Sequence, residues 1–127
     1  MTMAKNTKNF KTSEFTCHCG CGTNKIDQRV INMAQTIRDA LGVPVHVNSG
    51  YRCKKHNSQV SKVKNSYHTQ GLAADLACSL GAVKMFETVK KLKAEGKLPD
   101  LEYCILYNWG IHIDCGSKRK NMWEVRT

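Results

Sequence analysis

Three residues of this sequence offer side chains of the kind that hold a catalytic metal. His68 and Asp75 lie seven positions apart, and His112 follows them in the last fifth of the chain. Two imidazoles and one carboxylate suit a catalytic zinc ion, whose fourth position stays open for water. Three residues between the first two ligands are small enough to let backbone and metal approach closely, namely Gly71, Ala73 and Ala74. The sequence therefore predicts a small zinc hydrolase.

This interpretation depends on how the local elements place the side chains. A histidine on a strand is more often satisfied by hydrogen bonds than bound to a metal, and an aspartate at a strand end is often a cap. Side chains alternate along a strand, so Ala73 shares a face with Asp75, and His112 shares a face with Asp114. If the two strands are neighbours, the three ligands meet over one sheet surface. Asp114 would then orient a ligand or handle protons.

Apolar periodicity predicts two long helices. The first begins after an N-cap at Asp27 and ends at Gly42, with an apolar face formed by Val30, Ile31, Ala34, Ile37 and Leu41. The second is capped by Ser79 and ends at Gly96, with an apolar face formed by Leu80, Val83, Phe86, Val89 and Leu92. We also expect a short helix at residues 52–60.

The remaining apolar segments predict strands at residues 43–48, 72–76, 101–106 and 111–115. The fold class that follows is α+β, with a small antiparallel sheet and helices packed against it. A length of 127 residues suits one core. We expect a flexible tail at residues 1–9 and a single zinc hydrolase domain at residues 10–127. Phe10 and Phe15 should anchor the N-terminal arm, and Trp123 should dock the basic C-terminal tail.

The charge balance limits the partners. Twenty Lys and Arg residues against ten Asp and Glu residues give a net charge of +10, which favours polyanions such as nucleic acid, anionic lipid or an acidic cell wall. Aromatic residues are scarce and do not alternate with the basic clusters, so a stacking platform for single strands is not expected and nucleic acid is the less favoured partner. No apolar run is long enough to span a membrane, and the N-terminus does not have the pattern of a secretory signal. We therefore expect synthesis in the cytoplasm.

Seven cysteines are many for this length. The lack of a signal argues against a disulfide framework, and three cysteines in apolar surroundings should pack as small hydrophobic residues, namely Cys78, Cys104 and Cys115. Cys17, Cys19 and Cys21 cluster, but their alternate spacing differs from that of zinc knuckles and no matching second pair follows. Whether this cluster binds metal or forms disulfides stays open.

Several motifs together resemble one known family. Ser66-x-His68-x-x-Gly71-x-Ala73-x-Asp75 resembles the signature of the zinc D-alanyl-D-alanine carboxypeptidase family, cell-wall metallopeptidases that share their fold with the hedgehog signalling domain. The segment Asn48 to Cys53 resembles the family's Ser-Gly-Tyr-Arg segment, and Ile111 to Asp114 resembles its closing strand. The arm from Phe10 to Cys21 resembles that of the compact members, including those that are phage endolysins. The resemblance covers roughly residues 10 to 116.

The resemblance implies a role for each matching residue. His68, Asp75 and His112 match the zinc ligands. Arg52 matches an arginine that engages the carboxylate of the substrate or the developing oxyanion, for which its planar fork is suited. Ser66 is expected to add a hydrogen bond at the same end of the substrate. Zinc would polarise the peptide carbonyl and acidify a water molecule.

The sequence identifies the catalytic base less directly than the zinc ligands. Many relatives carry an acidic base three residues before the last histidine ligand, where this chain has Trp109. Compact relatives have the His-x-Asp form seen here, so Asp114 is the candidate base. Three alternatives stay open: Asp114 supports a ligand, Asp114 is itself the ligand while His112 is catalytic, or Glu102 is the base.

The function predicted from these residues is hydrolysis of peptidoglycan stem peptides, at a terminal D-Ala-D-Ala bond or an internal bond such as L-Ala-D-Glu. The short chain, the missing signal and the charge together indicate a monomeric phage or prophage lysin that reaches the cell wall after holin-type release. Its positive charge would draw it to anionic wall polymers. One alternative is a non-catalytic, zinc-stabilised structural or virion-associated protein of the same fold, and another is a basic nucleic-acid binder with a structural zinc. Turnover of purified peptidoglycan would distinguish the peptidase from both.

Overall fold

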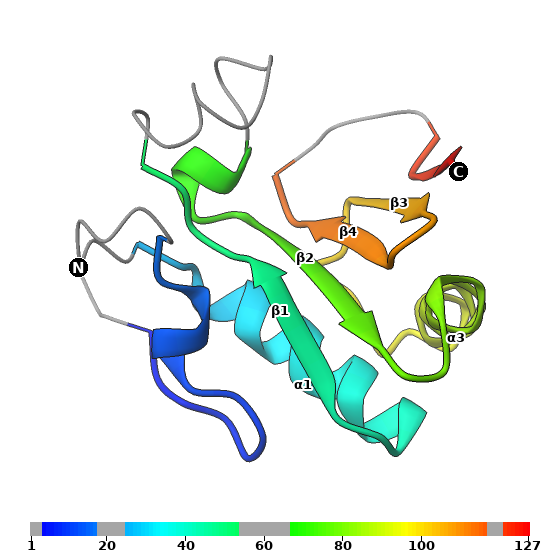
Figure 1. Cartoon of the computed structure of the whole chain (residues 1–127), viewed down its shortest axis with the longest axis horizontal. Coiled ribbons are helices and arrows are strands. Elements are labelled where there is room, and N and C mark those ends of the chain that lie inside the picture. The colour runs from blue at the N-terminus through cyan, green and yellow to red at the C-terminus, as the bar shows by residue number, and fades with distance from the viewer. Residues whose placement is uncertain (1–3, 18–24, 54–66, 117–120) are drawn as a thin grey trace.

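The computed structural model describes residues 4–17, 25–53, 67–116 and 121–127. In chain order the elements are the 3-10 helix η1 (Thr12–Phe15), helix α1 (Gln28–Leu41), strand β1 (Val45–Ser49), the 3-10 helix η2 (Tyr67–Gln70), strand β2 (Ala73–Cys78), helix α3 (Ala82–Ala94), and strands β3 (Tyr103–Tyr107), β4 (Ile111–Asp114) and β5 (Trp123–Arg126) (Figure 1). The helix predicted at residues 52–60 lies largely outside the described residues.

The strands form one sheet in the order β1-β2-β4-β3-β5. All neighbouring pairs are antiparallel except β3 and β5, which are parallel. The α+β fold class predicted from the sequence is confirmed. The fifth strand was not predicted, because β5 is a short edge strand of four solvent-accessible side chains, two apolar and two charged, and gives a weak hydrophobic signal.

Helix α1 begins and ends as its sequence predicts. The side chain of Asp27 accepts a hydrogen bond from the backbone N–H of Arg29 at 2.9 Å, which satisfies one of the free donors of the first turn. Gly42 ends the helix with a φ of 70°, a left-handed conformation that glycine adopts without a steric penalty. The predicted apolar face is buried, and Met33 joins it.

The prediction for the second helix was wrong at its start. Helix α3 begins after Gly81, which has a φ of 91° and no side chain to cap the first turn, so Ser79 does not cap it. Leu80 precedes the helix and Val83 lies in its first turn, and their side chains are 45% and 58% exposed. The buried face begins one turn later and consists of Met85, Phe86, Val89 and Leu92.

The two faces of the sheet differ in character. One face packs against α1 and α3, and its core side chains are Val45, Val47, Ala74, Leu76, Cys104, Leu106, Ile111 and Ile113. Figure 1 shows α1 behind β1 and β2. Because side chains alternate along a strand, Asp75, His112 and Asp114 lie on the opposite face. The helices therefore leave the face that carries the candidate ligands uncovered.

The two ends of the chain are tied to this body. Phe10 and Phe15 are buried, with ring centroids 6.0 Å apart, so the anchors predicted for the N-terminal arm are confirmed. The ring of Trp123 meets the ring of Phe86 edge to face at 5.7 Å, which confirms its docking. Backbone N–H groups of Lys5 and Asn9 donate to side chains of α1, and the flexible tail at residues 1–9 stays a prediction.

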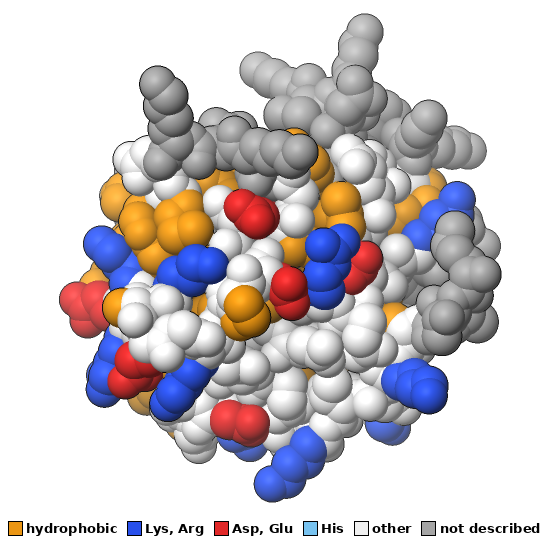
Figure 2. Space-filling model, turned by 180° about the vertical axis from the view of Figure 1, so that it is seen from behind, with side chains coloured by type: hydrophobic (Ala, Val, Ile, Leu, Met, Phe, Trp, Pro, Cys, Tyr) orange, Lys and Arg blue, Asp and Glu red, His pale blue; other side chains and the backbone are white. Residues whose placement is uncertain are grey.

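The surface seen from behind in Figure 2 carries basic and acidic side chains side by side rather than one patch of a single sign. Within the described ranges, no helix has both the length and the apolar character needed to cross a membrane.

Candidate active site

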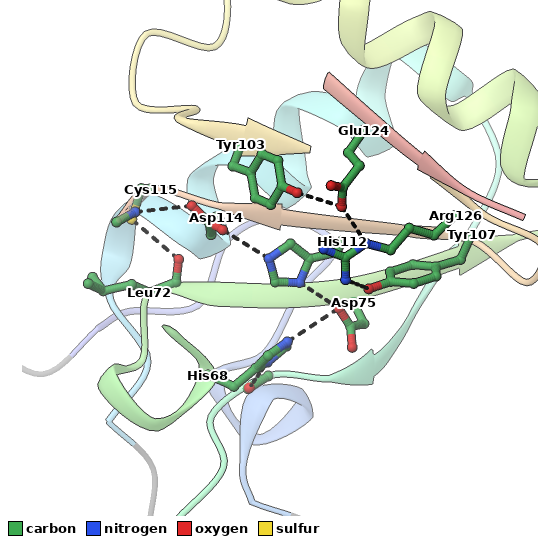
Figure 3. A network of polar contacts seen from close by, with 12 residues as sticks. His68, Leu72, Asp75, Tyr103, Tyr107, His112, Asp114, Cys115, Glu124 and Arg126 are labelled. Carbon is green, nitrogen blue, oxygen red and sulfur yellow. Dashed lines mark hydrogen bonds and ion pairs between the residues drawn. The ribbon is translucent and has the colours of Figure 1, made fainter. Parts of the chain in front are cut away.

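Strands β2 and β4 bring the candidate ligands together. The two strands are antiparallel neighbours, and Asp75 stands directly opposite His112 in their register. His68 comes from η2, just before β2 begins. One potential ligand atom from each of the three residues lies within 4.8 Å of the others. The condition set by the sequence, that the two strands must be neighbours, is therefore met (Figure 3).

Both imidazoles turn one nitrogen toward the Asp75 carboxylate. His68 Nε2 lies 3.3 Å from Asp75 Oδ1, and His112 Nδ1 lies 2.9 Å from the same oxygen. The opposite nitrogen of each ring has its own acceptor. His68 Nδ1 lies 2.8 Å from the carbonyl oxygen of Gly50, and His112 Nε2 lies 2.9 Å from Asp114 Oδ2. If each outer nitrogen donates its proton, the inner lone pairs converge, which is the usual arrangement of metal-binding histidines.

The segment from Ser49 to Cys53 fixes His68 twice. The Gly50 carbonyl holds the imidazole, and the backbone N–H of Arg52 donates to the His68 carbonyl oxygen at 3.0 Å. Gly50 itself packs so closely on the arm that a Cβ there would lie 2.6 Å from the Cα of Phe15. The sequence analysis missed this role of Gly50. The Ser-Gly-Tyr-Arg motif was the signal that could have indicated it.

The structure requires glycine at position 71 for a different reason from the predicted approach of backbone and metal. Gly71 has a φ of 73°, and a Cβ there would lie only 1.8 Å from the carbonyl oxygen of Lys25. Its own carbonyl oxygen accepts the N–H of Asp27 at 2.8 Å. Gly71 therefore lets the chain approach the start of α1 rather than the metal, and in this way it places η2 and His68.

Asp114 lies behind the His112 ring. Its side chain is 1% exposed, and its second oxygen accepts the backbone N–H of Gly116 at 3.3 Å. The carboxylate is therefore held by two donors and faces the imidazole. Glu102, the other acid considered as a base, has an exposed side chain and precedes β3, where its N–H donates to the Asp114 carbonyl.

The charges of the cluster depend on one another. Burial by itself would raise the pKa of Asp75, but hydrogen bonds from His112 and His68 outweigh burial and hold that pKa well below its usual range. Burial opposes the charged form of His112, yet hydrogen bonds to Asp114 and Asp75 outweigh it and raise the pKa of His112 to about 9. Without a metal, the cluster therefore keeps a proton on His112 between two carboxylates. A bound cation would take the place of that proton.

Arg52 is partly buried beside this cluster. Burial lowers the pKa of its guanidinium, and the nearby Asp75 and Tyr107 partly oppose that effect. Among the described residues its Nε has no hydrogen-bond partner although it is buried. A buried donor left unsatisfied costs about 1–3 kcal/mol, so an oxygen of a ligand would be favoured there. Ser66, the other predicted substrate contact, lies outside the described residues.

A second polar group lies on the same face of the sheet, the one that the helices do not cover. The ring of Tyr103 lies 6.2 Å from the His112 ring, and its hydroxyl donates to Glu124 at 2.6 Å. Arg126 forms an ion pair with Glu124 and donates to the Tyr107 hydroxyl at 3.4 Å (Figure 3). The sequence analysis missed Glu124 and Arg126 because it missed β5. The alternation of apolar and charged residues in Trp123-Glu124-Val125-Arg126 was the available signal.

Comparison with known families gives an independent finding. A sequence model of the family described as Peptidase M15 matches residues 8–114. The match includes all three ligand candidates, Arg52 and Asp114, and it ends before β5. The comparison with curated proteins finds no significant match. The family resemblance drawn from the sequence motifs is thereby confirmed.

Proposed function

Because this chain belongs to the peptidase M15 family, we propose that it is a zinc metallopeptidase that hydrolyses the stem peptides of peptidoglycan. Membership of the family supports a metallopeptidase-type activity. The observation that carries the proposal is the convergence of His68, Asp75 and His112 within 4.8 Å, with the outer nitrogen of each ring facing an acceptor. The bond cleaved would be a terminal D-Ala-D-Ala bond or an internal bond such as L-Ala-D-Glu.

The donor set fits zinc. Two imidazole nitrogens and one carboxylate oxygen are the ligands of many catalytic zinc sites, and all three belong to described, well-packed elements. When bound, zinc would supply Lewis-acid polarisation of a peptide carbonyl and an acidified water for attack. The protein's part is to orient both imidazoles so that their inner nitrogens face the ion, which the Gly50 carbonyl and the Asp114 carboxylate are placed to do.

We assign Arg52 to the substrate. Its buried Nε, which has no partner among the described residues, and the charge interaction of its guanidinium with Asp75 support a role in binding an oxygen of the peptide, either a terminal carboxylate or the developing oxyanion. A guanidinium can donate two parallel hydrogen bonds to such a group. We keep Ser66 as a further contact at that end of the substrate.

We propose that Asp114 orients His112. The prediction that it is the catalytic base remains to be tested, but its burial and its two donors support the orienting role. A base must reach the proton that it removes, and a carboxylate on the far side of the imidazole from Asp75 is poorly placed to do so. Zinc ligation by Asp114 itself is less well supported, because Asp114 does not belong to the group of converging donors.

We further propose action at the cell wall, as a monomeric phage or prophage lysin that leaves the cytoplasm by holin-type release. The net charge of +10 supports attraction to anionic wall polymers. Basic and acidic side chains are mixed on the face seen in Figure 2, so on that face the attraction would come from the summed charge rather than from one patch.

Digestion of purified peptidoglycan tests the function. The zinc-loaded protein should release fragments whose masses identify the scissile bond, and the activity should disappear with a chelator and return with zinc. His46 on β1 is exposed, so His46→Ala serves as a control that should digest normally. Full zinc content without any fragment release would contradict the proposal and favour a non-catalytic protein of the same fold.

A further inference from the structure

The structure brings together two cysteines that are far apart in the sequence. Cys17 ends the N-terminal arm after η1, and Cys53 directly follows Arg52. The Cys17 thiol donates to the Cys53 sulfur at 3.6 Å although 36 positions separate the two residues, and the backbone N–H of Cys53 donates to the Cys17 sulfur at 3.3 Å. Cys17 is buried, while Cys53 is partly accessible. The sequence analysis placed Cys17 in a cluster that lacked a partner, and Cys53 provides one.

The separation of the two sulfurs indicates the chemistry. A disulfide bond is about 2.05 Å long, which is far shorter than the distance found here. Two thiolates bound to one tetrahedral zinc ion, each at about 2.3 Å, stand about 3.8 Å apart. The N–H donated to the Cys17 sulfur favours the thiolate form, because hydrogen bonds to a charged acceptor are the stronger ones.

We propose that Cys17 and Cys53 bind, as thiolates, a second metal ion of the zinc type that is separate from the His68, Asp75 and His112 site. Binding displaces one proton from each thiol, so no oxidant or reductant is needed. Cys17 and Cys53 would supply two of the ligands of this ion.

Two other cysteines differ from this pair in their surroundings. Cys104 and Cys115 are buried among apolar neighbours, and burial raises the pKa of each thiol, that of Cys115 to about 11. Such thiols stay protonated and pack as small hydrophobic groups, as the sequence predicts.

A metal at this place would join the arm to the segment that supports the active site. The two parts already meet through the backbone, where the N–H of Tyr51 donates to the Phe15 carbonyl at 2.8 Å. The same segment holds His68 through Gly50 and presents Arg52. The ion would therefore be structural. It would keep these groups in position without touching the substrate.

Native mass spectrometry of the full-length chain, purified under reducing conditions with zinc, counts the ions. Two zinc ions are expected in the wild type, and one in each of Cys17→Ser, Cys53→Ser and His112→Ala. Cys78→Ser replaces a partly buried cysteine elsewhere and should keep both. With cobalt in place of zinc, a thiolate-to-cobalt charge-transfer band should appear in the wild type and in His112→Ala, and should vanish in Cys53→Ser. A single ion in the wild type that Cys53→Ser keeps, or two ions in Cys53→Ser, would overturn the proposal.

A measurement on the wild type alone guards against variants that fail to fold. Alkylation followed by peptide mapping should find Cys17 and Cys53 protected while zinc is present and modified after a chelator is added. Protection that the chelator does not change, or a disulfide between Cys17 and Cys53 in the zinc-loaded protein, would overturn the proposal. Neither result would bear on the peptidase activity, which digestion of peptidoglycan tests separately.

Discussion

His68 and His112 face the same carboxylate but are held by different parts of the molecule. His68 sits in a short 3-10 helix, and its outer nitrogen meets a neutral carbonyl from a neighbouring loop. His112 sits inside the sheet, and its outer nitrogen meets the buried carboxylate of Asp114. The position of His68 therefore depends on how the loop and the N-terminal arm pack. The position and charge of His112 depend on electrostatics inside the sheet.

The largest expected effect comes from removing either histidine. His68→Ala or His112→Ala leaves two protein ligands, so zinc affinity should fall steeply and peptidase activity should be lost. His112→Ala also leaves Asp75 and Asp114 without the imidazole between them, so its metal-free form should lose more stability than that of His68→Ala. Zinc titration and thermal unfolding of both variants measure these effects. Equal zinc affinity of either variant and the wild type would remove that residue from the ligand set.

Asp114→Asn tests how the sheet supports His112. Asparagine keeps the size of the side chain but loses the charge that fixes the outer nitrogen, so zinc affinity should fall about 10–100-fold and added zinc should restore activity. The outcome that contradicts this role is turnover about a hundredfold low at saturating zinc, which is expected of a lost base. Glu102→Gln is the matched variant, because Glu102 is the other acid considered as a base. Of the two variants, the one whose turnover stays low at saturating zinc identifies the base.

The raised pKa of His112 should make both zinc binding and stability depend on pH. The raised pKa of His112, about 9, means that zinc must displace a proton, so apparent affinity should rise about tenfold per pH unit between pH 6 and 8. In the metal-free protein this raised pKa adds stability that is complete below pH 6.5 and is lost as the pH rises through about 9. The difference in unfolding free energy between wild type and His112→Ala should therefore shrink on going from pH 6 to pH 10. A free-energy difference that does not change with pH would show that His112 does not hold this proton in the folded protein.

The smallest expected effect on activity comes from a substitution in the segment that holds His68. Arg52→Lys keeps the charge and the backbone N–H that bonds to the His68 carbonyl, but it loses the planar fork. Activity on wall peptides should fall about tenfold, which corresponds to about 1.4 kcal/mol of transition-state stabilisation, while zinc content stays unchanged. Nearly normal cleavage by this variant would place Arg52 outside the substrate site.

The difference between local patterns in the sequence and packing between distant segments explains which features could be predicted. The ligands on β2 and β4 follow from alternation along two apolar strands, and α1 follows from its cap, its spacing and Gly42. The Gly50 carbonyl and the Cys17–Cys53 pair do not follow from local patterns, because both depend on how a loop packs on a distant arm, and only the Ser-Gly-Tyr-Arg motif gave a signal for Gly50. Glu124 and Arg126 were missed because β5 is held mainly by pairing with β3 and buries little apolar surface.

The most direct test of the central claim is a crystal structure of the zinc-loaded protein, with anomalous scattering used to locate the metal. The account predicts a zinc ion about 2.0–2.2 Å from His68 Nε2, an oxygen of Asp75 and His112 Nδ1, with Asp114 still bonded to His112 Nε2. Zinc bound by His112 Nε2 or by Asp114, or no zinc between β2 and β4, would contradict it.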